Sequence, residues 1–200
     1  MTETEKMQAG LLYDANYNAQ LLQARIRCKE LCYDFNRLRP AQEAEQQALM
    51  RRLLGRTGER FSILAPFWCD YGSNIEIGED FFANHNCVIL DGARVTFGDH
   101  VFIAPNCGFY TAGHPLDAER RNQGLEYAHP ITVGDNVWFG AGVQVMPGVT
   151  IGDGTVIGAG SIVTRDIPAG VVAAGNPCRV LRAITQADRH AYKENRQCSF

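Results

Sequence analysis

Apolar side chains recur every six residues through the second half of this chain. The first position of each repeat is aliphatic or aromatic without a miss: Val133, Phe139, Val145, Ile151, Ile157 and Val163. The residue four positions later is small or β-branched each time: Val137, Val143, Val149, Thr155, Ser161 and Ile167. A period of six fits neither a helix nor a strand alone. It fits a short strand followed by a turn, so it predicts a parallel β-helix of stacked strands whose first positions point inward.

Small residues mark the turns of this repeat, and one long segment interrupts it. The residue after the first position is glycine at 134, 140, 152 and 158, and we expect glycine or another small polar residue to turn each corner. The repeats at 77–82, 97–102 and 103–108 obey the same rule. Residues 110–130 do not, and we expect them to form a protruding loop. Long insertions in such folds are usually functional or disordered.

The first part of the chain has a helical period instead. Arg39-Pro40 should end a first helix, because the residue before proline avoids the α conformation, and Gly55 should close a second helix over 41–54. We therefore expect a helical hairpin within residues 1–57 that packs on the β-helix of residues 58–200. The apolar stripe of the first helix alternates spacings of three and four residues: Leu21, Ala24, Cys28, Leu31, Phe35 and Leu38.

Composition and charge narrow the functional classes. The 200 residues carry a net charge of -3, which supplies no general positive field for nucleic acid or an anionic membrane. No apolar stretch reaches membrane-spanning length and the amino terminus lacks the pattern of a secretory signal, so we expect a cytoplasmic protein. The seven cysteines form no C-x-x-C pairs, which argues against a disulfide framework or a zinc ribbon, and we expect no metal. Most should be small buried hydrophobic residues.

The charges are unevenly placed along the chain. Residues 61–163 hold three basic against eleven acidic residues, whereas residues 164–200 hold six against three. The carboxyl-terminal tail could therefore attract phosphates. Its basic residues are Arg165, Arg179, Arg182, Arg189, Lys193 and Arg196.

Several segments together resemble a known family. The chain is similar to the hexapeptide-repeat acyltransferases, and more closely to the sugar O-acetyltransferases of the maltose, galactoside and nodulation type. The resemblance implies a left-handed β-helix, acetyl-CoA as cosubstrate, and a homotrimer with active sites between subunits. The segments that carry the resemblance are 6–14, 69–72, 81–84, 110–115, 134–138 and 174–180.

Transfer of an acetyl group to a hydroxyl requires a base, and histidine is the natural candidate. The resemblance implies that His114, followed by Pro115, is this base, and that Asn84 donates to the oxyanion. The residues alone also allow an exposed loop histidine and an asparagine at a left-handed corner. His100 at a corner is interpreted as a solvated turn residue, whereas His85 could line the site.

Fixed donors and acceptors are needed to recognise the hydroxyls of a sugar. Asp14 and Arg25 would place the helical segment over the site, and Glu126 could orient the imidazole of His114. Relatives can carry a second acidic residue after Asp91, but Gly92 stands here, which leaves the acceptor open. A turn, cap or surface charge is the alternative for each candidate. The acceptor-binding candidates are Asp14, Arg25, Asp70, Asn84, Asp91 and Glu126.

Coenzyme A needs an open groove for its pantetheine arm and cations for its phosphates. Small residues at Ala141, Gly158 and Ala159 would leave such a groove in consecutive repeats. The phosphates would meet four residues of the basic region: Thr164, Arg165, Arg179 and Arg182. A basic tail that only balances an acidic solenoid is the alternative.

Other functions of the same fold remain open at this point. Within the transferases, serine, antibiotics and nucleotide-sugar amines are alternative acceptors. A γ-class zinc hydratase needs three histidines at one metal, but position 119, five residues after His114, is glutamate. A non-catalytic solenoid would favour flat threonine ladders, and the outward positions are mixed. Trp138 is expected to pack against a neighbouring subunit.

Overall fold

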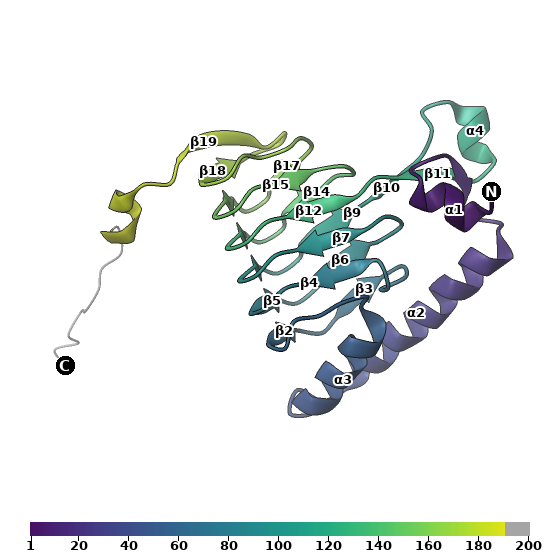
Figure 1. The fold of residues 1–200 in the computed structure, drawn as a ribbon, viewed down its shortest axis with the longest axis horizontal. Helices are drawn as coiled ribbons and strands as arrows, with labels where there is room; N and C mark the ends of the chain where they lie inside the picture. The colour runs from purple at the N-terminus through teal and green to yellow at the C-terminus, as the bar shows by residue number, and fades with distance from the viewer. Residues whose placement is uncertain (191–200) are drawn as a thin grey trace.

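The computed structural model describes residues 1–190, and its body is a three-sided prism of stacked strands (Figure 1). Face I contains β2 (Phe61–Ile63), β5 (Phe81–Ala83), β8 (Phe102–Ile103), β13 (Trp138–Phe139), β16 (Val156–Ile157) and β18 (Val171–Ala174), and β19 (Arg179–Ala183) adds antiparallel to β18. Face II contains β3 (Phe67–Cys69), β6 (Cys87–Leu90), β9 (Gly108–Tyr110), β14 (Gln144–Val145) and β17 (Ile162–Val163). Face III contains β4 (Ile75–Ile77), β7 (Val95–Phe97), β12 (Ile131–Val133) and β15 (Thr150–Ile151).

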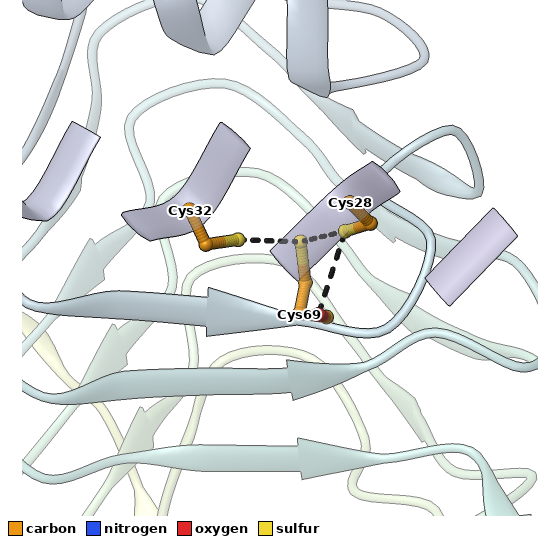
Figure 2. A group of neighbouring side chains, drawn as sticks. All are labelled: Cys28, Cys32 and Cys69. Carbon is orange, nitrogen blue, oxygen red and sulfur yellow. Dashed lines mark hydrogen bonds between the residues drawn. The ribbon is translucent and has the colours of Figure 1, made fainter. Parts of the chain in front are cut away.

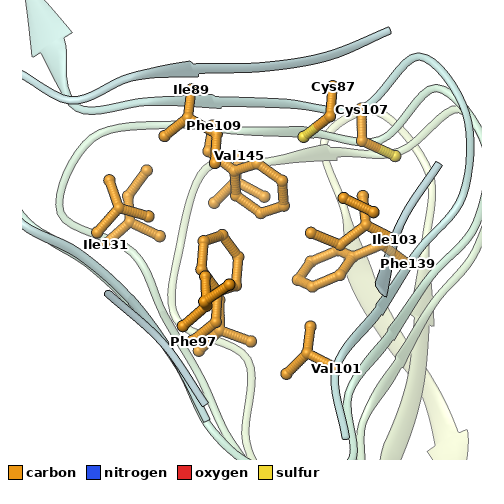
Figure 3. Close-up of a cluster of buried hydrophobic side chains, with 14 of the residues drawn as sticks. Cys87, Ile89, Phe97, Val101, Ile103, Cys107, Phe109, Ile131, Phe139 and Val145 are labelled. Carbon is orange, nitrogen blue, oxygen red and sulfur yellow. The ribbon is translucent and has the colours of Figure 1, made fainter. Parts of the chain in front are cut away.

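The chain visits the three faces in turn, and each strand pairs in parallel with the strand one coil away. This confirms the predicted parallel β-helix. Both inward positions of every predicted repeat are buried, none more than 5% exposed. The interior also holds a stack of phenylalanines (Figure 3), in which Phe109 lies 5.0 Å from Phe97 and 5.2 Å from Phe139 between ring centroids. The six-residue period is therefore the period of one side of the prism.

The corner residues differ from the prediction. Residues with a left-handed backbone stand three positions after the first position of a repeat, as at Gly142 with φ 73°. Gly140, in the predicted corner position, has another reason to be glycine, because a Cβ there would lie 2.5 Å from the backbone nitrogen of Ala159 in the next coil. One glycine thus turns the chain, and the other lets two coils approach closely.

Polar residues take the left-handed corners of the earlier coils. Asn86 has φ 63° and His100 has φ 55°, and both are exposed. His100 is therefore a solvated corner residue, as interpreted from the sequence. The alternative interpretation of Asn84 as a left-handed corner is wrong, because Asn86 occupies that position.

Helices at the amino-terminal side form the predicted hairpin. The described elements are α1 (Glu3–Gln8), β1 (Tyr13–Asp14), α2 (Ala19–Arg37) and α3 (Glu43–Leu53). The short α1 is not predicted, and a capping box between Thr2 and Glu5 stabilises its start. Cys28, Phe35 and Met50 belong to the same buried cluster as the interior of the solenoid. The hairpin therefore shares the core of the β-helix.

The interruption of the repeat is an arm, defined as residues 110–130, with secondary structure of its own. It contains β10 (Ala112–Gly113), α4 (Ala118–Asn122) and β11 (Leu125–Ala128). Strand β11 pairs antiparallel with both β10 and β1, so the amino-terminal segment rests on the arm (Figure 1). The described chain ends in a short 3₁₀ helix, η1 (Gln186–His190). No helix within residues 1–190 is long and apolar enough to cross a membrane.

Candidate functional site

Ten of the predicted site residues lie on two different edges of the prism. Turns that follow face I strands form edge I/II, which carries four of the predicted residues: Asn84, Ala141, Gly158 and Ala159. Turns that follow face II strands form edge II/III, from which the arm emerges. This second edge carries Asp70, Asp91, His114, Glu126, Thr164 and Arg165. Face II separates the two groups within one chain.

His114 lies on the arm, directly after β10, with its side chain 49% exposed. Its Nδ1 is 3.1 Å from the carbonyl oxygen of Leu125. A carbonyl oxygen can only accept, so Nδ1 carries the hydrogen and Nε2 keeps its lone pair. The backbone of β11 thus sets the tautomer that a general base needs, and the sequence does not reveal this contact.

The carboxylate of Glu126 lies beside the lone-pair nitrogen of His114. Its Oε1 is 3.8 Å from Nε2, and its Oε2 accepts a hydrogen bond of 3.2 Å from the hydroxyl of Tyr13. Tyr13 is 1% exposed, and burial raises the pKa of its phenol, which therefore stays protonated and donates. Two groups therefore contact the imidazole ring, the carbonyl of Leu125 at Nδ1 and the predicted Glu126 at Nε2. Tyr13 has no predicted role, because its position depends on the pairing of β1 with β11.

Asp91 was predicted to contact the acceptor, and the structure contradicts this. Its side chain is fully buried, and its Oδ1 accepts hydrogen bonds from the backbone N–H groups of Asp70 (3.0 Å) and Tyr71 (2.8 Å). Its Oδ2 lies 3.4 Å from the backbone N–H of Asn74. Burial raises the pKa of Asp91 to about 6. This carboxylate therefore shapes the turn that presents Asp70, and it cannot reach a ligand.

Asp70 and Arg25 lie close to this turn. Asp70 is half-buried, and burial raises the pKa of its carboxyl while the charges of Arg25 and Lys29 oppose that shift. Arg25 donates to the hydroxyl of Tyr71 at 2.7 Å and to the carbonyl of Ala15 at 2.5 Å. The bond to Tyr71 connects α2 to the first coil beside Asp70, and the bond to Ala15 connects α2 to the segment that follows β1.

Asp14 and Gly92 complete the surroundings of the arm. Asp14 lies on β1 opposite Leu125, and its Oδ1 accepts from the N–H of Tyr17 at 2.8 Å, which is the turn role named as its alternative. A Cβ at Gly92 would lie 3.1 Å from the hydroxyl of Tyr13. The side chain of a second acidic residue at position 92 would crowd the Tyr13 hydroxyl. The glycine therefore suits the Tyr13–Glu126 contact.

Asn84 stands on the other edge, so the structure does not bring it to His114 within one chain. Its Oδ1 accepts from the N–H of His85 at 2.7 Å, which leaves the Nδ2 group as the donor of this side chain. Ala141 and Ala159 are exposed above it on the same edge. They are one full coil apart, linked by the bond from Gly160 N to Ala141 O, and not in consecutive repeats as predicted.

The predicted phosphate-binding residues are also divided. Thr164 and Arg165 are exposed on edge II/III, whereas Arg179 and Arg182 lie on β19 at the end of face I. Arg182 pairs with Asp188 through two contacts of 2.8 Å and 2.7 Å, so its guanidinium is already engaged. The predicted tail residues Lys193 and Arg196 lie outside the described residues.

Comparison with known proteins links both parts of the chain to one group of enzymes. The maltose acetyltransferase hexapeptide capping motif matches residues 6–58, and six repeats of the bacterial transferase hexapeptide match residues 130–165. The galactoside O-acetyltransferase of Escherichia coli is 47% identical over 192 residues, which cover 96% of this chain and 94% of that protein.

Solved structures give the same result. A galactoside acetyltransferase in complex with coenzyme A superposes with a TM-score of 0.93 at 46% identity, covering 98% of this chain and 97% of that one. A maltose O-acetyltransferase from Clostridium difficile superposes with a TM-score of 0.91 at 48% identity, covering 93% of this chain and 99% of that one. The similarity extends over the arm, the helical segment and the solenoid.

Proposed function

This chain belongs to the hexapeptide-repeat acetyltransferases of the galactoside and maltose type, and we propose that it acetylates a hydroxyl of a small sugar or glycoside. It is an acetyltransferase whose cosubstrate is acetyl-CoA. The observation that carries the proposal is the His114 imidazole, half-exposed on the arm, with Nδ1 held by Leu125 and Nε2 beside Glu126.

The reaction is a direct transfer in which His114 is the general base. Nε2 takes the proton of the acceptor hydroxyl while its oxygen attacks the thioester carbonyl. The tetrahedral intermediate then collapses, and the coenzyme thiolate leaves with the proton that the imidazolium returns. Glu126 stabilises the imidazolium between these two steps, because its carboxylate lies 3.8 Å from Nε2. Base assistance of this kind supplies about 10²- to 10⁴-fold in rate.

The negative oxygen of the intermediate needs a donor, and the Nδ2 group of Asn84 is the candidate. Since Asn84 lies on edge I/II and His114 on edge II/III, we place each active site between edge I/II of one copy and edge II/III of another. A homotrimer closes such contacts into a ring. Exposed aromatic side chains support an interface on face I, where Phe102 is 50% and Trp138 is 51% exposed.

The coenzyme likewise binds between two copies of the chain in this proposal. The pantetheine arm lies along Ala141, Gly158 and Ala159 of one copy, where small side chains leave the coils open. Thr164 and Arg165, exposed on edge II/III of the neighbouring copy, meet the phosphates, and Arg179 adds charge from β19. Arg182 contributes less, because Asp188 already engages it. Both substrates thus depend on the same pair of edges.

The proposed acceptor class is tested by thiol release from acetyl-CoA across maltose, glucose, a β-galactoside, serine and chloramphenicol. We expect release that depends on a sugar, together with an acetylated sugar identified by mass spectrometry. Hydrolysis without an acceptor is the background control. Faster release with serine or chloramphenicol than with every sugar would show that the acceptor class is wrong, although the coenzyme would still bind.

Replacing Glu126 by glutamine should lower kcat about tenfold, a loss of about 1.4 kcal/mol in transition-state stabilisation. The amide keeps an oxygen for Tyr13 but loses the charge beside Nε2 of His114. Glu119→Gln, which removes an exposed charge from α4 of the same arm, is the matched control. Steady-state kinetics with saturating acetyl-CoA measures both variants. Equal kcat values for them would remove Glu126 from the mechanism.

A further inference from the structure

Three thiols converge where the helical segment meets the first coil, apart from the residues of the proposed transfer. Cys28 and Cys32 are one turn apart on α2, and Cys69 is the last residue of β3 (Figure 2). None of the three is more than 3% exposed. An i, i+4 pair on a helix facing a strand end brings sulfur atoms from two distant segments together. We call this group the thiol triad.

The sulfur positions suit a single ion at their centre. Sγ of Cys69 lies 3.5 Å from Sγ of Cys28 and 3.8 Å from Sγ of Cys32, and all three atoms lie within 4.8 Å of one another. An ion held at a metal–sulfur distance of about 2.3 Å in a three-coordinate plane separates its sulfurs by about 4 Å. The two separations from Cys69, 3.5 Å and 3.8 Å, are slightly shorter than that value, so small side-chain rotations would make room for the ion.

The donor set selects the kind of metal. All three donors are sulfur, and no His, Asp, Glu or further Cys within residues 1–190 completes the group. The buried carboxylate of Asp91 is committed to backbone N–H groups. Structural zinc sites need four ligands, whereas soft ions such as Cu(I) favour thiolates. We propose that the thiol triad binds one soft, thiophilic metal ion of the Cu(I) class.

Protons leave the thiols when the ion binds. The three sulfur atoms lie side by side and buried, so a thiol that is to act as a thiolate ligand must first lose its proton. Each thiol that ligates as a thiolate exchanges its S–H bond for an S–metal bond and releases the proton to solvent. The metal keeps its oxidation state. Affinity should therefore fall as pH falls.

The site would fasten α2 to the solenoid. Cys69 directly precedes Asp70, and Cys28 follows Arg25 by one helical turn on α2. An ion shared by the two elements therefore links the helical segment to the first coil through bonds that the apo protein lacks. Its binding is independent of acetyl transfer and can be measured without either substrate.

Anaerobic titration of the reduced full-length protein with Cu(I), in competition with a coloured Cu(I) chelator, tests the proposal. We expect one ion per folded chain that withstands the chelator, and at least a hundredfold weaker binding in Cys32→Ala and Cys69→Ala. Cys107→Ala removes a buried cysteine outside the triad and should bind as wild type does. X-ray absorption of the loaded protein should show three sulfur neighbours.

Three results would overturn the proposal. The first is transfer of all the copper from the wild-type protein to the chelator. This result requires no variant, so it decides the question even if the triad variants fold poorly. The second is binding that Cys107→Ala loses as fully as Cys32→Ala does. Loss of two titratable thiols on exposure to air, with no copper retained under reducing conditions, would likewise overturn it and assign the triad to disulfide chemistry.

Discussion

Replacing His114 by alanine should lower kcat for sugar acetylation by about 10²- to 10⁴-fold, the usual contribution of a general base. The side chain is exposed on the arm, where it supports no core contact, so the fold should be unchanged. Its loss removes the imidazole whose tautomer the carbonyl of Leu125 sets and whose Nε2 is the proposed proton acceptor. Binding of acetyl-CoA should be retained, because the predicted coenzyme-binding residues do not include His114.

Thiol release at saturating sugar and acetyl-CoA measures the effect, and calorimetric titration with coenzyme A measures binding. His100→Asn is the matched control, since asparagine tolerates the left-handed backbone that His100 adopts at an exposed corner. Turnover in His114→Ala within a factor of two of the control would remove His114 from the role of base.

Phe109→Ala should reduce the free energy of unfolding by about 3–5 kcal/mol, because deleting a buried ring loses its transfer energy and leaves a cavity. Phe109 is fully buried and stacks edge to face between Phe97 and Phe139, so no neighbour can close the space cheaply. For a chain of this length we expect the melting temperature to fall by about 10 °C.

Thermal unfolding followed by circular dichroism measures this, with all proteins at one concentration because the stability of an oligomer depends on it. Leu116→Ala is the control, since that side chain is 97% exposed on the arm. A melting temperature for Phe109→Ala equal to that of the control would mean that the stack contributes nothing measurable to the core.

The repeat and the helical hairpin could be predicted because each leaves a local signature. A side chain at Val133 or Phe139 must point inward for its coil to close, and this burial recurs with every side of the prism. The stripe from Leu21 to Leu38 marks α2 in the same way. Such signals need no knowledge of distant contacts, so composition and spacing suffice.

The finer features of the site depend on contacts that no local pattern reveals. The Tyr13–Glu126 bond needs β1 to pair with a strand more than a hundred residues away. Asp91 is predicted to bind the acceptor, and only its burial against the Asp70 turn shows that its role is structural. The thiol triad likewise joins α2 to β3, and its members were expected only to be buried hydrophobic residues.

The roles of individual glycines also could not be predicted from the sequence. Gly140 and Gly142 both recur with the repeat, and the spacing predicts the corner at position 140, whereas the structure has it at position 142. The backbone angle decides the role of Gly142, and the approach of Ala159 decides that of Gly140. Two different physical requirements therefore lead to the same residue type at these two positions.

Subunit mixing tests most directly the claim that each active site joins His114 of one copy to Asn84 of another. His114→Ala and Asn84→Ala should each be nearly inactive alone. Denatured together in equal amounts and refolded, they should recover about a quarter of the activity of wild type treated identically, because one site in four then receives both intact residues. Mixed assemblies as inactive as either parent would contradict this account, since both residues would then have to act within one chain.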